Sequence, residues 1–206
     1  MNRAKLSLTI HSLIEYILMN SPYLKNLGPI NYDSAEGQQK QLLEKALNQV
    51  GFIPNMYANM VNVPAILSTY LHGYDAFRSN SGFSPVEQEI IFLAISQVNG
   101  CNYCTAAHSM LADKVSGVPK DILNSIRTNQ PIQDKKLKAL FEVAQDIVTH
   151  YGQPSSDIVK AFFDIGYSEL QLLNIILATS VKVLSNYTNH AFATEIDTQF
   201  SKYRID

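Results

Sequence analysis

The sequence contains no tryptophan and only two cysteines among its 206 residues. Two cysteines cannot supply the disulfide framework that holds small secreted domains together. The formal net charge is only −2, which excludes a broad basic face for nucleic acid or anionic lipid. No apolar run approaches the roughly 20 residues that a transmembrane helix needs. The length suits one domain with a full core, so we expect residues 1–206 to form a single domain.

The segment Leu6–Met19 is apolar enough to suggest a secretory signal peptide. However, His11 and Glu15 interrupt it, and Asn20-Ser21-Pro22 offers no small-x-small cleavage site. We therefore expect an amphipathic helix over residues 12–20 of a mature, cytoplasmic protein. A reducing cytosol keeps a cysteine pair as thiols, or cycles it, rather than using it as a permanent crosslink.

Apolar residues recur at helical spacing along the whole chain, and no stretch shows sustained period-two alternation. The sequence therefore predicts an all-α protein. Glycines and prolines separate the expected helices. These helices cover residues 12–20, 42–50, 55–60, 64–77, 85–98, 101–116, 122–126, 135–148 and 158–163. Residues 1–40 are expected to form an N-terminal helix followed by a long arm.

A weak internal repeat appears at an offset of 84 residues. Ser84-x-x-Glu87 and Ser168-x-x-Gln171 are both capping boxes, and Asn102-Tyr103 matches Asn186-Tyr187. This offset predicts that the helix pair over 82–116 returns as a degenerate copy over 166–200, without the thiols. The alternative is chance similarity, because capped apolar helices resemble one another.

Both cysteines lie in one short stretch together with a histidine. In a helix, Cys101, Cys104 and His108 occupy positions i, i+3 and i+7, which share one face. Asn99-Gly100 predicts a break, so Cys101 is expected near a helix N-terminus, where the helix dipole favours a thiolate. Glu89, on the preceding helix, can fold back beside the cysteines. Two thiols, a base and a carboxylate form a candidate redox site.

Other interpretations of these residues stay open. The cysteines could be small apolar core residues, or bind zinc with His108 and Glu89, although a second Cys or His pair at metal spacing is missing. His108 alone could be structural, and Glu89 could be a solvated helix residue. We favour the redox site and expect no metal and no bound organic cofactor. Three tyrosines are candidates for lining a substrate pocket, namely Tyr57, Tyr70 and Tyr74.

The spacing Glu89-x11-Cys101-x2-Cys104-x3-His108 resembles the core motif of the alkylhydroperoxidase D family, which is part of the carboxymuconolactone decarboxylase superfamily. The glycine before the first cysteine and the capped preceding helix agree with the resemblance. It is sharpest over residues 84–112 and extends loosely over 42–200. The first 35 residues carry no such match.

The resemblance implies a helical fold with internal duplication, assembled as a homo-oligomer, either a trimer or a hexamer. It also implies reduction of hydroperoxides by a dithiol that cycles to a disulfide and is restored by an external protein or small-molecule thiol. By the same resemblance, Cys104 attacks the peroxide, Cys101 resolves it, and Glu89 and His108 relay protons. Some members carry a further relay histidine where this sequence has Tyr103, so this phenol is at most an auxiliary group.

Two arguments conflict over which thiol attacks the peroxide. The helix dipole favours Cys101, but an effect of roughly 0.3–1 kcal/mol changes a pKa by less than one unit. A positioned base such as His108 is worth about 10²–10⁴ in rate, and it lies one turn from Cys104. We therefore expect Cys104 to be the attacking thiol and Cys101 to be the more accessible, resolving one.

The leading hypothesis for function is a dithiol peroxidase with an antioxidant role. A general thiol–disulfide oxidoreductase or redox sensor could use the same site without peroxide specificity. A decarboxylase-type lactone enzyme is a weaker alternative, because that chemistry needs no dithiol. A structural or interaction protein with a vestigial site is the alternative from outside enzymology.

Overall fold

The computed structural model describes residues 21–205, and over this range it confirms the all-α prediction, with no strand. The α-helices are α2 (Gly37–Val50), α3 (Asn55–Met60), α4 (Pro64–Asn80), α5 (Pro85–Val98), α6 (Asn102–Leu111), α7 (Lys120–Arg127), α8 (Lys135–Thr149), α9 (Ser156–Asp164) and α10 (Glu169–Phe192). Shorter turns are η1 (Tyr32–Ser34) and η3 (Thr198–Tyr203), which are 3₁₀-helical, and η2 (Ala112–Ser116), which is π-helical. The helix expected over 12–20 lies outside the described residues. Within the described range, no helix has both the length and the apolar character to cross a membrane.

Local signals set most helix ends where the sequence predicts them. Ser84 caps α5 by accepting from the backbone N–H of Glu87, whose carboxylate accepts in return from the backbone N–H of Ser84. Asp134 caps α8 in the same way through its side chain. Helix α2 ends at Gly51, whose φ of 82° is in the left-handed region that glycine adopts without strain.

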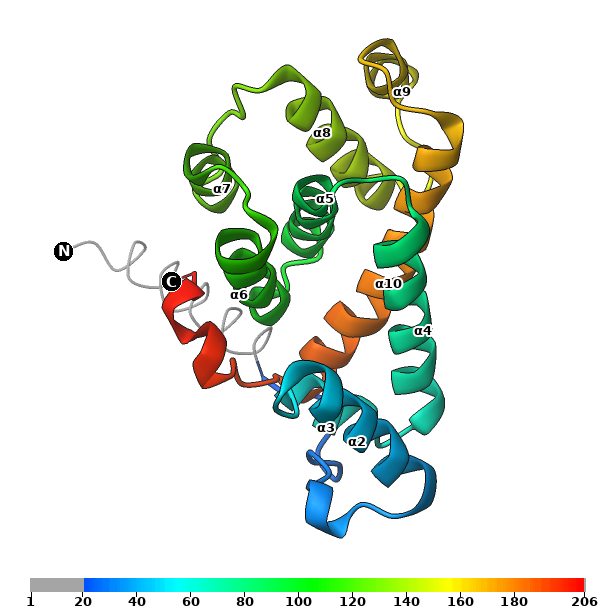
Figure 1. Ribbon diagram of the computed structural model, residues 1–206, viewed down its shortest axis with the longest axis vertical. Helices are drawn as coiled ribbons and strands as arrows, with labels where there is room; N and C mark the ends of the chain where they lie inside the picture. Colours follow the sequence, from blue (N-terminus) through cyan, green and yellow to red (C-terminus); the bar gives the residue numbers. More distant parts are fainter. Residues whose placement is uncertain (1–20, 206) are drawn as a thin grey trace, which may run out of the picture.

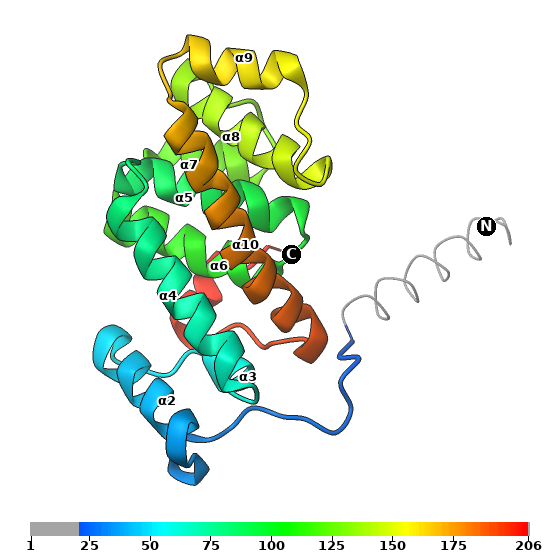
Figure 2. The ribbon, with the colours of Figure 1, turned by 90° about the vertical axis from the view of Figure 1, so that its right-hand side faces the viewer.

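Helix α5 is the centre of the molecule, and it packs against α6, α8 and α10 (Figure 1). The long α10 runs diagonally across the molecule and lies beside α4, as both views show (Figure 2). This close packing depends on Gly73, because a Cβ atom at that position would lie 2.7 Å from Val181 Cγ2. The absence of a side chain there lets α10 approach the rest of the bundle.

The buried side chains form two apolar clusters. The first lies among α5, α7, α8, α9 and the first half of α10, and the second among α2, α3, α4, α6 and η3. Cys101 and Cys104 belong to the second cluster, whereas the buried apolar side chains of α5 belong to the first. The rings of Phe92 and His108 lie 4.7 Å apart across the junction of the two clusters. The candidate redox residues therefore lie where the two clusters meet.

The predicted repeat holds for the capping boxes only. Ser168 and Gln171 cap α10 as Ser84 and Glu87 cap α5. However, α10 continues without a break through 24 residues, so residues 166–200 do not form the second helix pair that the 84-residue offset predicted. The reason is local, because Val183 and Leu184 stand where the first copy has Asn99 and Gly100, and neither ends a helix.

Candidate functional site

The turn between α5 and α6 positions both cysteines. Gly100 adopts a φ of 66°, and Cys101 follows as the N-cap of α6, so the helix begins one residue later than Cys101 itself. The backbone N–H of Cys104 points to Cys101 Sγ at 3.4 Å. The two thiols thus lie at one helix start, one turn apart, and both are free.

Neither thiol is accessible from the surface. Cys101 is 1% exposed and Cys104 is 2% exposed, so the expectation that Cys101 is the more accessible one is wrong. The helix start is covered by α10 and by the C-terminal segment, because α6 packs against both α10 and η3. Any substrate must reach the sulfurs through cavities.

Helix α10 supplies a row of polar residues beside the thiols, and two of them contact the sulfurs. Asn189 Nδ2 lies 3.2 Å from Cys104 Sγ and 3.7 Å from Cys101 Sγ. The Cys104 thiol also donates to the hydroxyl of Ser185 at 3.8 Å. Sequence reasoning missed both residues. The available signal was the spacing of Lys182, Ser185 and Asn189, which places three polar residues at positions i, i+3 and i+7 on one helix face.

Lys182 is the third member of this row, and it is 1% exposed. Its ammonium lies 5.6 Å from the centre of the Phe92 ring. Among the described residues, no carboxylate forms an ion pair with it. A buried ammonium without a counter-ion is costly unless it stabilises negative charge nearby. The charge of Lys182 lowers the pKa of the Cys104 thiol and so favours its thiolate form.

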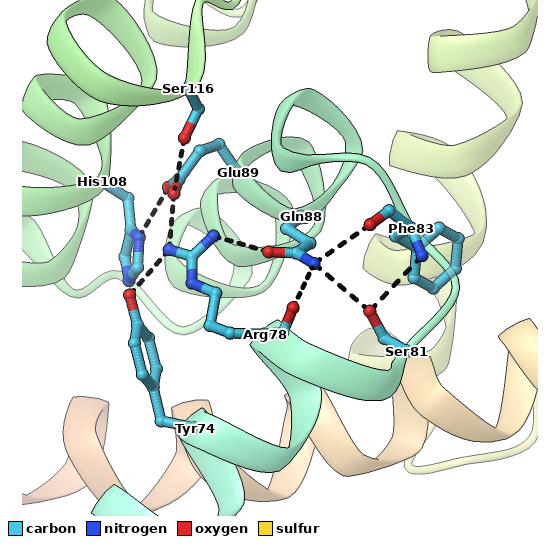
Figure 3. A network of polar contacts seen from close by, with 8 residues as sticks. All are labelled: Tyr74, Arg78, Ser81, Phe83, Gln88, Glu89, His108 and Ser116. Carbon is cyan, nitrogen blue, oxygen red and sulfur yellow. Dashed lines mark hydrogen bonds and ion pairs between the residues drawn. The ribbon is translucent and has the colours of Figure 1, made fainter.

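The carboxylate and the histidine of the motif lie together as the sequence predicts. His108 Nδ1 and Glu89 Oε2 are 2.8 Å apart, and both side chains are buried (Figure 3). The guanidinium of Arg78 donates to the other oxygen of Glu89, and Ser116 Oγ donates to that oxygen at 3.3 Å. Ser116 comes from the π-helical turn η2, a rare geometry that directs its side chain back to α5. Glu89 therefore has partners at both oxygens.

These contacts determine which groups are charged. Burial would raise the pKa of Glu89, but His108 and Arg78 outweigh it and the pKa is lowered. Burial, with a further contribution from the charge of Lys182, lowers the pKa of His108 to about 4. At neutral pH the imidazole is therefore neutral. Since its Nδ1–H donates to the Glu89 carboxylate, Nε2 carries the lone pair that can accept a proton.

The two thiols differ in acidity, in the direction opposite to the helix-dipole argument. Burial raises the pKa of Cys101 well above its usual range, and the interaction with Cys104 adds to this. Burial would also raise the pKa of Cys104. However, the hydrogen bond with Cys101 and the charge of Lys182 hold it well below the usual range. Cys104 is thus the better nucleophile of the pair at neutral pH.

Cys104 and Cys101 line different cavities. The cavity at Cys104 has a volume of about 190 Å³, and its wall is apolar except for His108 and Lys182. The tyrosines proposed from the sequence, Tyr57, Tyr70 and Tyr74, do line it. The cavity at Cys101 has a volume of about 240 Å³ and is more polar, with Asn102, Asn189, His190, Thr194 and Arg204 in its wall.

Tyr103 lies in the wall of both cavities, between the two cysteines. Its hydroxyl donates to the carboxylate of Asp197, which in turn accepts from the backbone N–H of Asn55 at 3.1 Å. Burial, together with the Asp197 carboxylate, raises the pKa of the phenol. Through Asp197, the phenol thus links α6 to the C-terminal segment and to the start of α3. Its O–H donates a hydrogen bond to Asp197 and not to either sulfur.

The zinc alternative lacks a ligand set. Over residues 21–205, no group of three or more histidine, cysteine, aspartate or glutamate side chains is arranged to hold a metal ion. Two of the four residues in that alternative are already paired, because the His108 ring and the Glu89 carboxylate bind each other. The arrangement is that of a thiol site with a proton acceptor and a buried cation.

Comparison with known proteins agrees with the motif. Residues 64–146 match the model of the carboxymuconolactone decarboxylase family, and this segment holds Glu89, both cysteines and His108. No curated protein matches the sequence at a significant level. The family segment thus contains the whole motif, whereas Lys182, Ser185 and Asn189 lie outside it.

Solved structures share the fold at low sequence identity. A peroxidase-related protein from Ralstonia eutropha JMP134, described as an alkylhydroperoxidase AhpD core, is 18% identical with a TM-score of 0.73, covering 84% of this chain and 93% of its own. A peroxidase-related protein from Silicibacter sp. TM1040 is 19% identical with a TM-score of 0.68, covering 86% and 96%. A variant of the debrominase Bmp8 in complex with 2,3,4-tribromopyrrole is 16% identical with a TM-score of 0.74, covering 89% and 97%. These likenesses establish an AhpD-like fold.

Proposed function

We propose that this AhpD-like member of the carboxymuconolactone decarboxylase superfamily is a cytoplasmic dithiol peroxidase that reduces small organic hydroperoxides as an antioxidant. The observation that carries the proposal is the environment of Cys104. Its thiol shares an apolar cavity with a neutral imidazole and a buried ammonium, and a second thiol lies one helical turn away. The environment supports a thiolate nucleophile, a proton acceptor and a resolving thiol at one place.

In the proposed first step, Nε2 of His108 relays the proton of the Cys104 thiol to water, so that Cys104 reacts as a thiolate while the imidazole stays neutral. The thiolate attacks the terminal oxygen of the hydroperoxide, so that an S–O bond forms and the O–O bond breaks. Cys104 becomes a sulfenic acid, and the other fragment leaves as an alkoxide. Lys182 gives this alkoxide its proton, and a proton from water then restores the ammonium.

The second step uses Cys101. Its sulfur attacks the sulfenic sulfur of Cys104, the thiol proton and the hydroxyl leave as water, and the disulfide forms. The spacing at the helix start allows this bond with little backbone movement. An external thiol then reduces the disulfide, so that the balance is one hydroperoxide and two thiols to one alcohol, one disulfide and water.

The shape of the cavity at Cys104 suggests the size of the substrate. Its volume of about 190 Å³ is slightly larger than an engineered apolar cavity of about 150 Å³ that holds benzene. Tyr57, Tyr70 and Tyr74 offer aromatic faces rather than charged groups. We therefore propose compact alkyl or aryl hydroperoxides in preference to long-chain lipid hydroperoxides.

A second candidate is reductive removal of bromine from an aromatic ring. The aromatic, apolar wall of the same cavity favours it, and one protein with this fold is a debrominase, solved in complex with a bromopyrrole. The electron balance is the same, because one aryl bromide and two thiols give one arene, one disulfide and hydrogen bromide. A general protein disulfide reductase is disfavoured, because both sulfurs are buried.

A steady-state assay tests the proposal. The purified protein is given cumene hydroperoxide, tert-butyl hydroperoxide, hydrogen peroxide or tribromopyrrole, with a lipoyl carrier, thioredoxin or glutathione as reductant. We expect turnover with the organic hydroperoxides that is lost in Cys104→Ser. Bromide release without peroxide turnover would favour the second candidate. Inertness of both thiols to every substrate would contradict a redox function.

A further inference from the structure

The two cysteines open to different sides of the start of α6. Cys104 contributes to the apolar cavity and not to the polar one, while Cys101 contributes to the polar cavity and not to the apolar one. Tyr103 stands between them, and its hydroxyl is held by Asp197. A molecule in the polar cavity can therefore approach Cys101 without passing the aromatic cavity.

We infer that the polar cavity of about 240 Å³ at Cys101 is the binding site of the reductant, and that it selects small thiols or dithiols that carry an anionic group. The inference rests on the proposed function, because it assumes that a Cys101–Cys104 disulfide forms. It goes beyond that proposal by assigning the reductant to a site of its own and by giving its charge.

The chemistry of disulfide exchange requires attack on one particular sulfur. An incoming thiolate that attacks Cys101 Sγ forms a mixed disulfide and breaks the bond to Cys104, which leaves with the electron pair as a thiolate. A leaving thiolate of lower pKa leaves faster. The hydrogen bond with Cys101, Lys182 and Ser185 favour this charge on Cys104, whereas at Cys101 burial and the interaction with Cys104 outweigh the effect of Lys182. A second thiolate then releases Cys101, so that two reductant thiols become one disulfide.

The wall of the polar cavity favours an anion. Arg204 and His190 line it, and over residues 21–205 no aspartate or glutamate does. The side chain of Arg204 forms no ion pair with any described residue. Arg204 is exposed, so its side chain can turn toward a ligand. A cation in the wall of a polar cavity attracts a carboxylate or sulfonate.

An unsatisfied polar atom of a residue that lines the cavity gives independent support. The side chain of Asn189 is 3% exposed and lines the cavity. Its Nδ2 donates toward both sulfurs, but its Oδ1 has no hydrogen-bond partner within the described structure. Leaving a buried acceptor unpaired is costly. An N–H or S–H donor of a bound reductant would satisfy it at the place where the exchange begins.

The test measures the reductive half-reaction alone. The protein is oxidised with diamide, which needs no peroxide, and is mixed with thiols of equal length and different charge. These are 2-mercaptoethanesulfonate, 2-mercaptoethanol and cysteamine. Because the chain has no tryptophan to report the change, the reaction is quenched with N-ethylmaleimide and read by mass spectrometry. At equal thiolate concentration, we expect the sulfonate to react fastest and cysteamine slowest.

Replacing Arg204 decides the assignment. Arg204→Gln should slow reduction by the sulfonate about fivefold, speed or leave unchanged reduction by cysteamine, and leave the rate of oxidation by peroxide unaltered. Lys202→Gln is the matched control, because Lys202 is exposed in the same segment but does not line the cavity. Equal changes for all three thiols, or a mixed disulfide trapped on Cys104, would overturn the inference. If diamide forms the disulfide and peroxide does not, the peroxidase proposal fails while the charge selectivity is still measured.

Discussion

Asn189 Nδ2 lies 3.2 Å from Cys104 Sγ, although 85 residues separate the two along the chain. The same amide lies 3.7 Å from Cys101 Sγ, so one donor serves both sulfurs. The amide keeps the thiols close to one another and favours negative charge on Cys104, where its distance is shorter. Helix α10 thus contributes to a site whose recognisable motif lies on α5 and α6.

The charge of Lys182 should control the reactivity of Cys104. Lys182→Met removes the charge and keeps the length of the side chain, so the pKa of Cys104 should rise. We expect the rate of alkylation of Cys104 by iodoacetamide at neutral pH to fall about tenfold or more, as one pKa unit of lost stabilisation implies. In the variant the rate should also increase steeply with pH, up to about pH 8.5.

Lys160→Met is the control for this prediction, because Lys160 is exposed and pairs with Asp164. It removes one positive charge far from the thiols and should leave the pH profile of alkylation unchanged. An unaltered profile in Lys182→Met would show that the ammonium does not act on Cys104.

The proposed role of Lys182 as a proton donor makes a separate prediction about the leaving group. An alkoxide leaving from an alkyl hydroperoxide needs a proton, whereas a carboxylate leaving from a peracid does not. In a single-turnover reaction, with the thiolate fraction matched by pH, Lys182→Met should lose about 10²-fold with tert-butyl hydroperoxide. It should lose much less with perbenzoic acid. Equal losses with both oxidants would contradict proton donation.

The two cysteines should give different products with peroxide. Cys101→Ser leaves Cys104 without a resolving partner, so a sulfenic acid should accumulate there and be trapped by dimedone. Cys104→Ser should show little trapped product on Cys101, because burial holds the pKa of that thiol high. Mass spectrometry of the labelled peptides distinguishes the two. The reverse pattern would make Cys101 the nucleophile and favour the disulfide-reductase alternative.

His108 should make stability depend on pH. Its pKa is about 4 in the folded protein against about 6.5 in an unfolded chain, so the unfolded chain takes up a proton first as the pH falls. The contribution is complete above about pH 7 and is lost between about pH 6.5 and 4. At pH 5 the free energy of unfolding should be about 2 kcal/mol lower than at pH 8.

Urea unfolding of the reduced protein at both pH values measures this loss. His108→Gln should be less stable than the parent at pH 8, because it loses the Glu89 contact. Its further loss between pH 8 and pH 5 should be smaller by about 2 kcal/mol. His72→Gln, at an exposed position, should keep the full pH dependence of the parent. A full dependence retained in His108→Gln would assign it to other groups.

We propose a homo-oligomer, as a trimer or hexamer, and place a contact on the outer face of α10. Leu170, Leu173 and Ile176 follow one another at helical spacing there and are 72%, 61% and 48% exposed. A second copy of the chain would bury them. Leu173→Lys should shift the sedimentation profile toward the 23.0 kDa monomer. Leu27→Lys is an exposed control outside this face. A parent protein that is already monomeric at micromolar concentration would remove the proposal.

Much of the fold could be predicted from the sequence because its signals are local. A capping box at Ser84 and a glycine at position 51 act on neighbouring backbone groups, so they determine helix ends wherever the helix finally packs. The pairing of Glu89 with His108 was also predictable, because a single tight turn joins their helices. The absence of a second helix pair was not predictable from the matched caps, because a cap determines where a helix begins and not where it breaks. Leu184 stands where the first copy has a glycine, so α10 continues through this position.

By itself, the sequence determined the helices, the position of the two thiols at one helix start and the carboxylate that faces the histidine. All of these depend on interactions between residues close along the chain. Only the tertiary structure decided the acidity order of the two thiols and the cavities that they face. Both depend on Lys182, Ser185 and Asn189 of α10, which reach the thiols because Gly73 lets α10 pack closely. Burial and charge act through space, so a buried cation can reverse a helix-dipole effect that the local sequence predicts.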